Sequence, residues 1–166
     1  MALMESTQKL KAGDRAPDFN LVGVDGKFHK LDDYSQARAI LVVFMCNHCP
    51  YVLAKMPALL ELHRVYAPKG VAVIGINSNN NPDYPDDDFA HMQAFAKEKG
   101  MRFPYLFDDS QNVAKAYGAV CTPDPFLFDG TGALVYHGRI DDAMTPDAQP
   151  AKHDLADALD MVLDGR

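Results

Sequence analysis

The sequence contains no tryptophan and only three cysteines among its 166 residues. Cysteines that are this few and this clustered do not form a disulfide scaffold, so in a reducing compartment we expect them to be catalytic, metal-binding or merely buried. No apolar run approaches the roughly 20 residues that a membrane helix needs, so no membrane partner is expected. Positively charged residues are fewer than negatively charged ones, and the net charge of −7 argues against a nucleic-acid partner.

The first residues, Met1–Lys11, are polar and lack the apolar core of a signal peptide. We therefore predict a cytoplasmic protein. The chain length suits one domain with a full hydrophobic core. A content of 48% hydrophobic and 23% charged residues is typical of globular proteins, and the chain shows no internal repeat or low-complexity tract. The prediction is one domain over residues 1–166, in which residues 1–12 form a flexible N-terminal tail.

Predicted strands and helices alternate along this domain. The dipeptide Asp25-Gly26 is a strong signal for the turn of a β-hairpin. Apolar runs predict strands at 40–45, 71–76, 105–107, 126–128 and 134–136. Helical spacing of apolar residues predicts helices that begin near Pro50, Phe89, Asp109 and Leu155. This order implies an α/β sheet with an antiparallel pair at one edge.

Details of several elements also follow from the pattern. In the first helix the residues predicted to share a buried face are Val52, Met56, Leu59, Leu60 and His63. Pro57 falls inside this helix and is expected to kink it. Residues 77–88 are polar and rich in Pro and Asp, so we expect an exposed, solvated loop. Either Asp109 or Ser110 is expected to cap the third helix.

The segment Cys46-Asn47-His48-Cys49-Pro50 stands between a buried strand and a helix. A Cys-x-x-Cys pair at a strand-to-helix junction is typical of a redox site. A thiol at a helix N-terminus meets unpaired N–H groups and the positive end of the helix dipole, which stabilise its thiolate. The thiolate is the nucleophilic form of cysteine, so the position favours nucleophilic chemistry.

Together with Cys121-Thr122-Pro123 before the strand 126–128, this unit resembles the thioredoxin-like superfamily. Within that superfamily the chain looks like the alkyl hydroperoxide reductase/thiol-specific antioxidant (redoxin) branch. The resemblance extends over residues 13–163 and includes Gly13–Phe19, the Asp25-Gly26 turn, Phe126–Asp129 and Tyr136–Arg139. It implies a thioredoxin-like α/β fold, with a central mixed sheet, helices on both faces and an N-terminal β-hairpin.

The resemblance also assigns the nucleophile. In this superfamily a proline follows the nucleophilic cysteine by eight positions, often after a methionine in the redoxin branch. Met56-Pro57 has this relation to Cys49, so Cys49 takes the place of the nucleophile. The superfamily's second cysteine would fall at Val52 and is absent. Its buried acid on the central strand would fall at Val43, so another group or water must handle the proton.

Two further thiols are candidate partners of Cys49. Cys46 is a candidate resolving thiol, with a buried structural thiol as the alternative. Cys121 precedes the loop that, by resemblance, packs beside the nucleophile, and it is a candidate to resolve Cys49, to bridge to another subunit, or only to pack. Pro123 is expected to be cis by resemblance, so that Thr122 and Pro123 position an extended substrate segment.

Other residues near the cysteines are candidates for positioning substrate. His48 lies between them and is a candidate to stabilise the thiolate or shuttle a proton, with solvent exposure as the alternative. Asn47 can only donate or accept hydrogen bonds. Pro50 fits the first position of the helix. His137 and Arg139 lie near a strand end and are expected to be surface residues.

The first functional hypothesis is a thiol-disulfide oxidoreductase that needs no cofactor. Its substrate would be a disulfide-containing protein or small molecule, and its reductant thioredoxin or glutathione. Cys49 would attack the disulfide, and Cys46 or Cys121 would resolve the mixed disulfide. A monomer and a homodimer are both compatible with the resemblance.

Two alternatives remain open. A thiol peroxidase with antioxidant activity would use Cys49 to attack a hydroperoxide. The peroxiredoxin pattern Pro-x-x-x-Thr-x-x-Cys is met at Cys49-Pro50, but Cys46 replaces its threonine and Val42 its proline. A copper- or zinc-binding protein would use Cys46, Cys49 and His48 with the distal His137, although no dedicated metal site is predicted.

Overall fold

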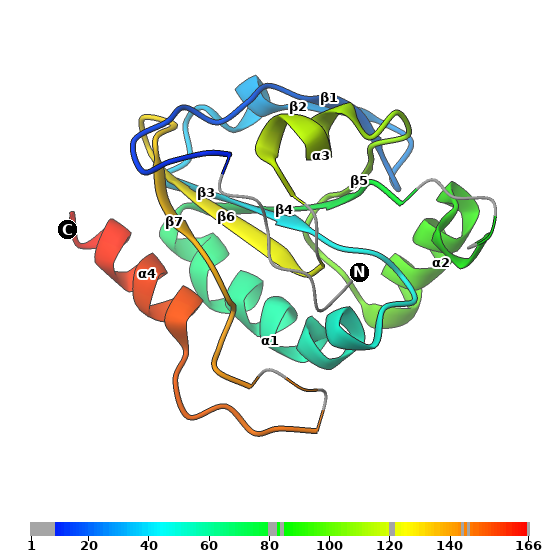
Figure 1. Ribbon diagram of the computed structural model, residues 1–166. Coiled ribbons are helices and arrows are strands. Elements are labelled where there is room, and N and C mark those ends of the chain that lie inside the picture. Colours follow the sequence, from blue (N-terminus) through cyan, green and yellow to red (C-terminus); the bar gives the residue numbers. More distant parts are fainter. Residues whose placement is uncertain are drawn as a thin grey trace.

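Figure 1 shows the computed structural model, which describes residues 9–79, 83, 85–119, 122–143, 145 and 147–165. The strands are β1 (Asn20–Gly23), β2 (Phe28–Lys30), β3 (Ala39–Phe44), β4 (Val71–Asn77), β5 (Tyr105–Phe107), β6 (Asp124–Asp129) and β7 (Leu134–His137). The α-helices are α1 (Pro50–Tyr66), α2 (Phe89–Lys99), α3 (Asn112–Tyr117) and α4 (Asp154–Leu163). Short 3-10 helices are η1 (Leu31–Tyr34), η2 (Ala67–Lys69) and η3 (Pro85–Asp87). The predicted alternation of strands and helices is confirmed.

The strands form one mixed sheet in the order β2-β1-β5-β4-β3-β6-β7. β4 runs parallel to both β3 and β5, and the remaining neighbours pair antiparallel. The predicted antiparallel pair at one edge is β6–β7, and the N-terminal hairpin β1–β2 forms the opposite edge. Because β3 and β4 are parallel neighbours, the segments that follow them leave the sheet at the same end of the strands.

All six residues of β3 are buried, which explains why its sequence is a continuous apolar run. Leu41 and Val43 pack in the cluster that contains residues of α1, α2 and α4. Ile40, Val42 and Phe44 pack in the cluster that contains residues of α3. Figure 1 shows α3 on one side of the sheet and α1 and α4 on the other. The prediction of helices on both faces is therefore confirmed.

The buried face of α1 differs in part from the predicted one. Its buried residues are Val52, Met56, Leu59, Leu62 and Tyr66. Leu60 and His63 are only partly buried, so the prediction was wrong for these two. The Tyr66 hydroxyl donates a hydrogen bond to the Asp160 carboxylate of α4 at 2.6 Å. The contact with α4 explains the difference, because it buries Tyr66 at the C-terminal end of α1.

The cap of α3 differs in part from the prediction. The Ser110 hydroxyl accepts a hydrogen bond from the backbone N–H of Asn112 at 3.2 Å, as one of the two predicted caps, but Asp108 serves the next two N–H groups. Asp108 is fully buried, and its carboxylate accepts hydrogen bonds from the backbone N–H groups of Val113, at 3.3 Å, and Ala114, at 2.9 Å. It also accepts one from the Ser78 hydroxyl at 2.6 Å. Asp108 thus joins the end of β4 to the start of α3, a contact that no local pattern around residues 109–110 reveals.

Replacing this carboxylate is expected to be costly. Asp108→Ala leaves the donors that Asp108 now serves without their acceptor, so we expect the free energy of unfolding to fall by about 3 kcal/mol. Urea unfolding followed by circular dichroism measures the change. The matched control is Asp109→Ala at an exposed position, with an expected change within about 0.5 kcal/mol. Equal stability of the two variants would contradict the assignment of Asp108 as the cap.

The predicted N-terminal tail is described only in part. Residues 1–8 of the predicted tail lie outside the described residues, so the tail and the single-domain boundary stay predictions. Within the part of the chain that the structure describes, every helix falls short of the length or apolarity that crossing a membrane requires.

Candidate active site

The cysteine pair lies where β3 ends and α1 begins. β3 ends at Phe44, the chain bends at Asn47 and His48, and Cys49 is the N-cap of α1 with extended backbone angles. Pro50 occupies the first helical position, as predicted, where its missing N–H costs nothing. Both sulfurs are free thiols in residues that are less than 10% exposed, at 5% for Cys46 and 7% for Cys49.

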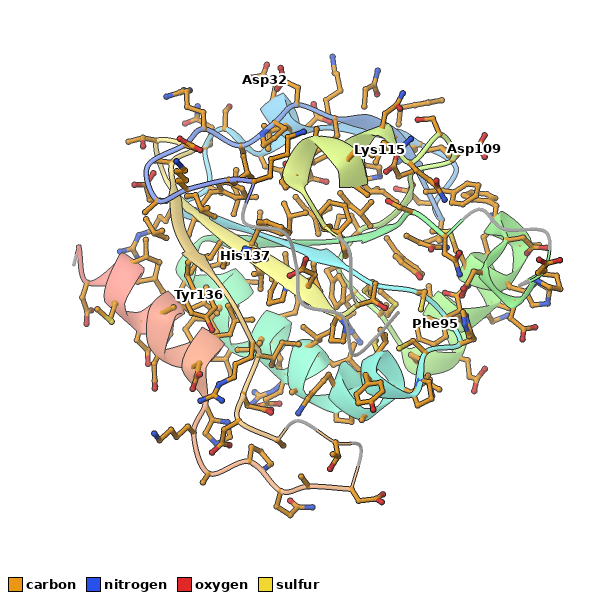
Figure 2. The ribbon with its side chains drawn as sticks, in the orientation of Figure 1. Asp32, Phe95, Asp109, Lys115, Tyr136 and His137 are labelled. Atoms are coloured by element: carbon orange, nitrogen blue, oxygen red, sulfur yellow. The ribbon has the colours of Figure 1, made fainter. Side chains whose placement is uncertain are left out.

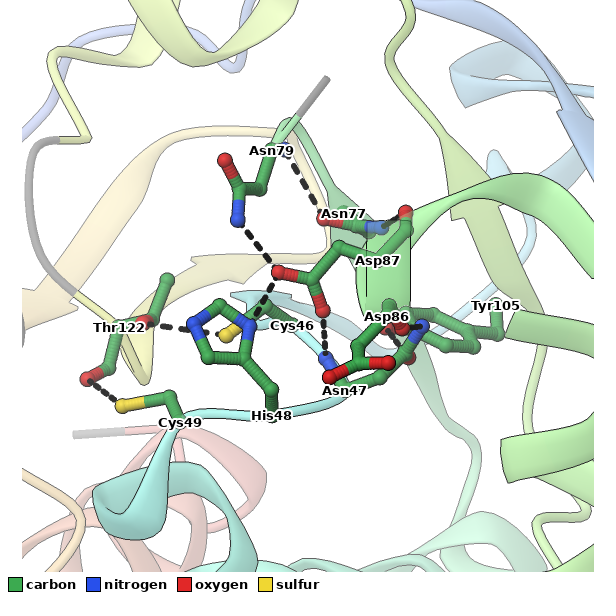
Figure 3. A network of polar contacts seen from close by, with 10 residues as sticks. All are labelled: Cys46, Asn47, His48, Cys49, Asn77, Asn79, Asp86, Asp87, Tyr105 and Thr122. Atoms are coloured by element: carbon green, nitrogen blue, oxygen red, sulfur yellow. Dashed lines mark hydrogen bonds and ion pairs between the residues drawn. The ribbon is translucent and has the colours of Figure 1, made fainter. Parts of the chain in front are cut away.

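The loop before β6 contacts both thiols. The Thr122–Pro123 peptide bond is cis, as the resemblance predicts. The Cys49 sulfur lies 3.9 Å from the Thr122 carbonyl oxygen, toward which its thiol donates. The Cys46 sulfur lies 3.8 Å from the Thr122 hydroxyl oxygen (Figure 3). Thr122 is thus brought against both cysteines, whereas Cys121 lies outside the described residues and its roles stay predictions.

A buried acid, Asp87, stands next to the cysteine pair. It lies on η3, is fully buried, and accepts a hydrogen bond from the backbone N–H of Asn47 at 2.6 Å. Its other carboxylate oxygen pairs with His48 Nδ1 at 2.5 Å and accepts a hydrogen bond from the Asn79 side-chain amide. Figure 3 shows Asp87 at the centre of this network.

The prediction of an exposed loop over residues 77–88 was therefore wrong for Asn77 and Asp87, which are fully buried. The Asn77 side-chain amide donates to the Asp87 carbonyl oxygen at 2.8 Å and so folds η3 back onto the end of β4. Because β3 and β4 are parallel, their carboxyl ends lie side by side, so the loop after β4 meets the cysteine turn there. That topological signal, combined with the missing acid at Val43, could have pointed to this loop.

Asn47 clamps the cysteine turn to two other segments. Its side-chain amide donates to the Asp86 carbonyl oxygen at 2.9 Å, and its amide oxygen accepts a hydrogen bond from the buried Tyr105 hydroxyl at 2.6 Å. These contacts hold the turn from β5 and from η3. A substrate-positioning role for Asn47 would act through this turn, and His48, whose side chain is 34% exposed, reaches the surface beside it.

The two thiols differ in their electrostatic surroundings. Burial, followed by the negative charge of Asp87, raises the pKa of the Cys46 thiol to about 11. A hydrogen bond to the Thr122 side chain acts in the opposite direction and does not outweigh these two causes. Cys46 is therefore a protonated thiol at neutral pH. Cys49 instead lies at the N-cap of α1, beside the positive end of the helix dipole.

The surface prediction for residues 137 and 139 holds for only one of them. Arg139 is exposed and pairs with Asp154 of α4. Figure 2 labels His137 on β7. Its side chain is 6% exposed, pairs with Asp124 at 2.8 Å and stacks on the Phe126 ring at 3.9 Å. Phe126 belongs to the cluster on the α3 face, whereas both cysteines pack in the cluster on the α1 face. A shared metal site of His137 with the cysteines is therefore not supported.

The sequence of this chain matches the model of a known protein family. The family model described as Redoxin matches residues 11–156. The chain belongs to the Redoxin family. One relative of this redoxin chain is the thiol-disulfide oxidoreductase ResA of Geobacillus thermodenitrificans, which is 30% identical over 122 residues. The match covers 74% of this chain and 66% of that relative, so the chain spans about two thirds of its length.

Solved structures agree with the family. An uncharacterized conserved protein from Geobacillus kaustophilus is 40% identical, with a TM-score of 0.92 over 98% of this chain and 87% of that one. A hypothetical protein from Sinorhizobium meliloti is 42% identical, with a TM-score of 0.91 over 97% and 88%. The thioredoxin domain of a thiol-disulfide oxidoreductase from Bacteroides vulgatus is 21% identical, with a TM-score of 0.67 over 79% and 90%, and shows the thioredoxin-like fold alone. Family and relatives together support an oxidoreductase.

Proposed function

We propose that this redoxin is a thiol-disulfide oxidoreductase in which Cys49 is the nucleophile and Cys46 is the resolving thiol. The observation that carries the proposal is the position of the two thiols. Cys49 caps α1 and lies 3.9 Å from the Thr122 carbonyl oxygen, while Cys46 lies on the adjoining turn and contacts the same residue at 3.8 Å. The thiol-disulfide oxidoreductase activity of the ResA relative supports the same reaction class.

The reaction then proceeds in two exchanges. The Cys49 thiolate attacks one sulfur of a substrate disulfide, the substrate S–S bond breaks, and one substrate thiolate leaves. Cys46 next loses its proton and attacks the Cys49 sulfur, which releases the second substrate thiolate and forms a Cys46–Cys49 disulfide. The substrate gains two electrons and the protein loses two. A dithiol reductant of the thioredoxin or glutathione class reverses the process.

Neighbouring residues have supporting roles in the proposed steps. His48 and Asp87 lie within 4.8 Å of the Cys46 sulfur and of each other, which places them to receive its proton. This pair substitutes for the buried acid that is missing at Val43. Thr122 and Pro123 lie where an extended substrate segment can pair with the loop, and Pro50 starts the helix that holds Cys49.

Disulfide mapping tests the proposal. Reduced protein is given one equivalent of oxidised glutathione or hydrogen peroxide, free thiols are blocked, and disulfides are mapped by mass spectrometry. We expect a Cys46–Cys49 bridge in the wild type and in the matched variant Cys121→Ser. A disulfide needs Cα atoms within about 7 Å, which the bend at residues 47–48 can provide.

Other outcomes would change the assignment. A Cys49–Cys121 bridge would move the resolving role to Cys121, and a Cys49 that stays a free thiol would overturn the function. Consumption of hydrogen peroxide in the presence of a regenerating dithiol distinguishes the peroxidase alternative, and we expect it to be slow relative to disulfide reduction. A cytoplasmic location would be consistent with thioredoxin or glutathione as the reductant.

A further inference from the structure

Three side chains with different metal-binding atoms meet beside the cysteine turn. The Cys46 sulfur, a His48 ring nitrogen and an Asp87 carboxylate oxygen all lie within 4.8 Å of one another. They come from two segments, the turn after β3 and η3, which the end of the sheet brings together. His48 and Asp87 are already in contact at 2.5 Å. The cluster therefore exists without any rearrangement of the backbone.

From this cluster we infer that the reduced protein binds one Zn²⁺ ion through Cys46, His48 and Asp87. Thiolate, imidazole and carboxylate are the three ligand types that zinc prefers, and three protein ligands with an open fourth position are typical of an accessible zinc site. One thiolate is too few for Cu(I), which prefers sulfur ligands, and a thiolate does not suit Mg²⁺ or Ca²⁺.

The dimensions of the cluster fit a tetrahedral ion after small side-chain shifts. Zn–N and Zn–O distances of about 2.0 Å and a Zn–S distance of about 2.3 Å put the ligand atoms roughly 3.3–3.6 Å apart. The His48–Asp87 contact of 2.5 Å must open by about 1 Å, and a separation near the 4.8 Å limit of the cluster must close by about as much. The His48 side chain, 34% exposed, has room to move. The same exposure provides an entry path for the ion.

Charge and outer contacts also favour the ion. Asp87 is fully buried, and a Cys46 thiolate beside it adds a second negative charge that one divalent cation neutralises. The backbone N–H of Asn47, at 2.6 Å, and the Asn79 amide hold the carboxylate in place before an ion arrives. Such outer hydrogen bonds orient ligands and strengthen metal binding.

Zinc and the proposed disulfide compete for the same sulfur, a consequence that rests on the proposed function. A disulfide substrate RSSR and the zinc-bound Cys46 thiolate with the Cys49 thiol would give the Cys46–Cys49 disulfide, RS⁻, RSH and free Zn²⁺. The two protein sulfurs lose two electrons, and RSSR gains them. The zinc-loaded protein is therefore expected to resist oxidation, and the oxidised protein to release zinc.

Titration of reduced, tag-free, chelator-treated protein with Zn²⁺ tests the site, with a chromophoric chelator as competitor. We expect one Zn²⁺ per chain in the wild type. Cys46→Ser and Asp87→Asn should each weaken binding by more than about 100-fold, because loss of outer-shell partners alone costs about 10–100-fold. Co²⁺ as a probe should show a thiolate-to-metal charge-transfer band that Cys46→Ser removes. Circular dichroism establishes that each variant is folded, and His48→Gln, at a part-exposed position, provides a second ligand variant.

Two matched variants isolate the cluster. His91→Gln removes another histidine that pairs with an aspartate, Asp88 at 2.7 Å, and should leave zinc binding unchanged. Cys49→Ser should keep zinc binding while it loses disulfide reduction, so failure of the zinc site and failure of the proposed function give different results. Absence of stoichiometric zinc in the wild type, or undiminished binding in Cys46→Ser, would overturn the inference.

Discussion

Replacing Cys49 by serine is expected to reduce disulfide turnover by roughly 1,000-fold or more, because the variant has no thiolate at the N-cap of α1 and loss of a nucleophile removes the first step. Insulin reduction with dithiothreitol as the electron source measures the loss. Cys46→Ser is expected to stop the cycle one step later. It should form the mixed disulfide on Cys49 but not release the substrate, so the covalent adduct accumulates in mass spectra.

The third cysteine provides the matched control for this pair of variants. Cys121→Ser changes the same atom type at a position that the proposal does not require, so its turnover should remain within about twofold of the wild type. If Cys46→Ser turned over normally and Cys121→Ser accumulated the adduct, the resolving role would belong to Cys121. If Cys49→Ser kept its activity, the proposed nucleophile would be wrong.

Neutralising Asp87 is expected to lower the pKa of the Cys46 thiol. The Asp87 charge is one of the two main causes that raise the pKa of the Cys46 thiol to about 11, and burial is the larger. Asp87→Asn removes the repulsion between a carboxylate and a thiolate, so the pKa of Cys46 should fall. It should stay above the ordinary thiol value, since burial is unchanged. Each unit by which the pKa falls raises the thiolate fraction at neutral pH about tenfold.

The measurement is the rate of alkylation of Cys46 as a function of pH, followed by mass spectrometry of its peptide in chelator-treated protein. Asp86→Asn is the matched control. Asp86 precedes Asp87 on η3 and is exposed, so this variant removes the same charge from a neighbouring surface position. Its Cys46 profile should superimpose on that of the wild type. A profile of Asp87→Asn that is unchanged, or shifted to higher pH, would contradict the electrostatic account.

These predictions depend on features that the sequence reveals to different degrees. The apolar run of β3, the Cys46–Pro50 motif and the Asp25-Gly26 turn are local signals, and each predicted its element correctly. Burial of the whole of β3 requires a continuous apolar sequence, and a helix start favours proline at its first position. The position of Cys49 at the N-cap of α1 likewise followed from residues that adjoin it in the chain.

The acids of the structure could not be assigned in the same way. Asp87, Asp108 and Asp124 are all buried, yet in the sequence they look like ordinary polar residues of loops and turns. Each is buried because its carboxylate meets donors from another segment: His48 for Asp87, Ser78 for Asp108 and His137 for Asp124. Such partners are known only once the strand order places the segments together.

The sequence by itself determined the alternation of strands and helices and the start of the helix that follows Cys49, because each depends on neighbouring residues or on a regular apolar period. The thioredoxin-like fold was predicted from the resemblance of its motifs to a known family. Only the tertiary structure decided which acid faces Cys46, which thiols Thr122 contacts and which histidine joins the site. Those contacts link segments about 40 and 75 residues apart, as between Asn47 and Asp87 or between Cys49 and Thr122. Their formation depends on the parallel pairing of β3 with β4 and the antiparallel pairing of β3 with β6, which bring the loops to one edge of the sheet.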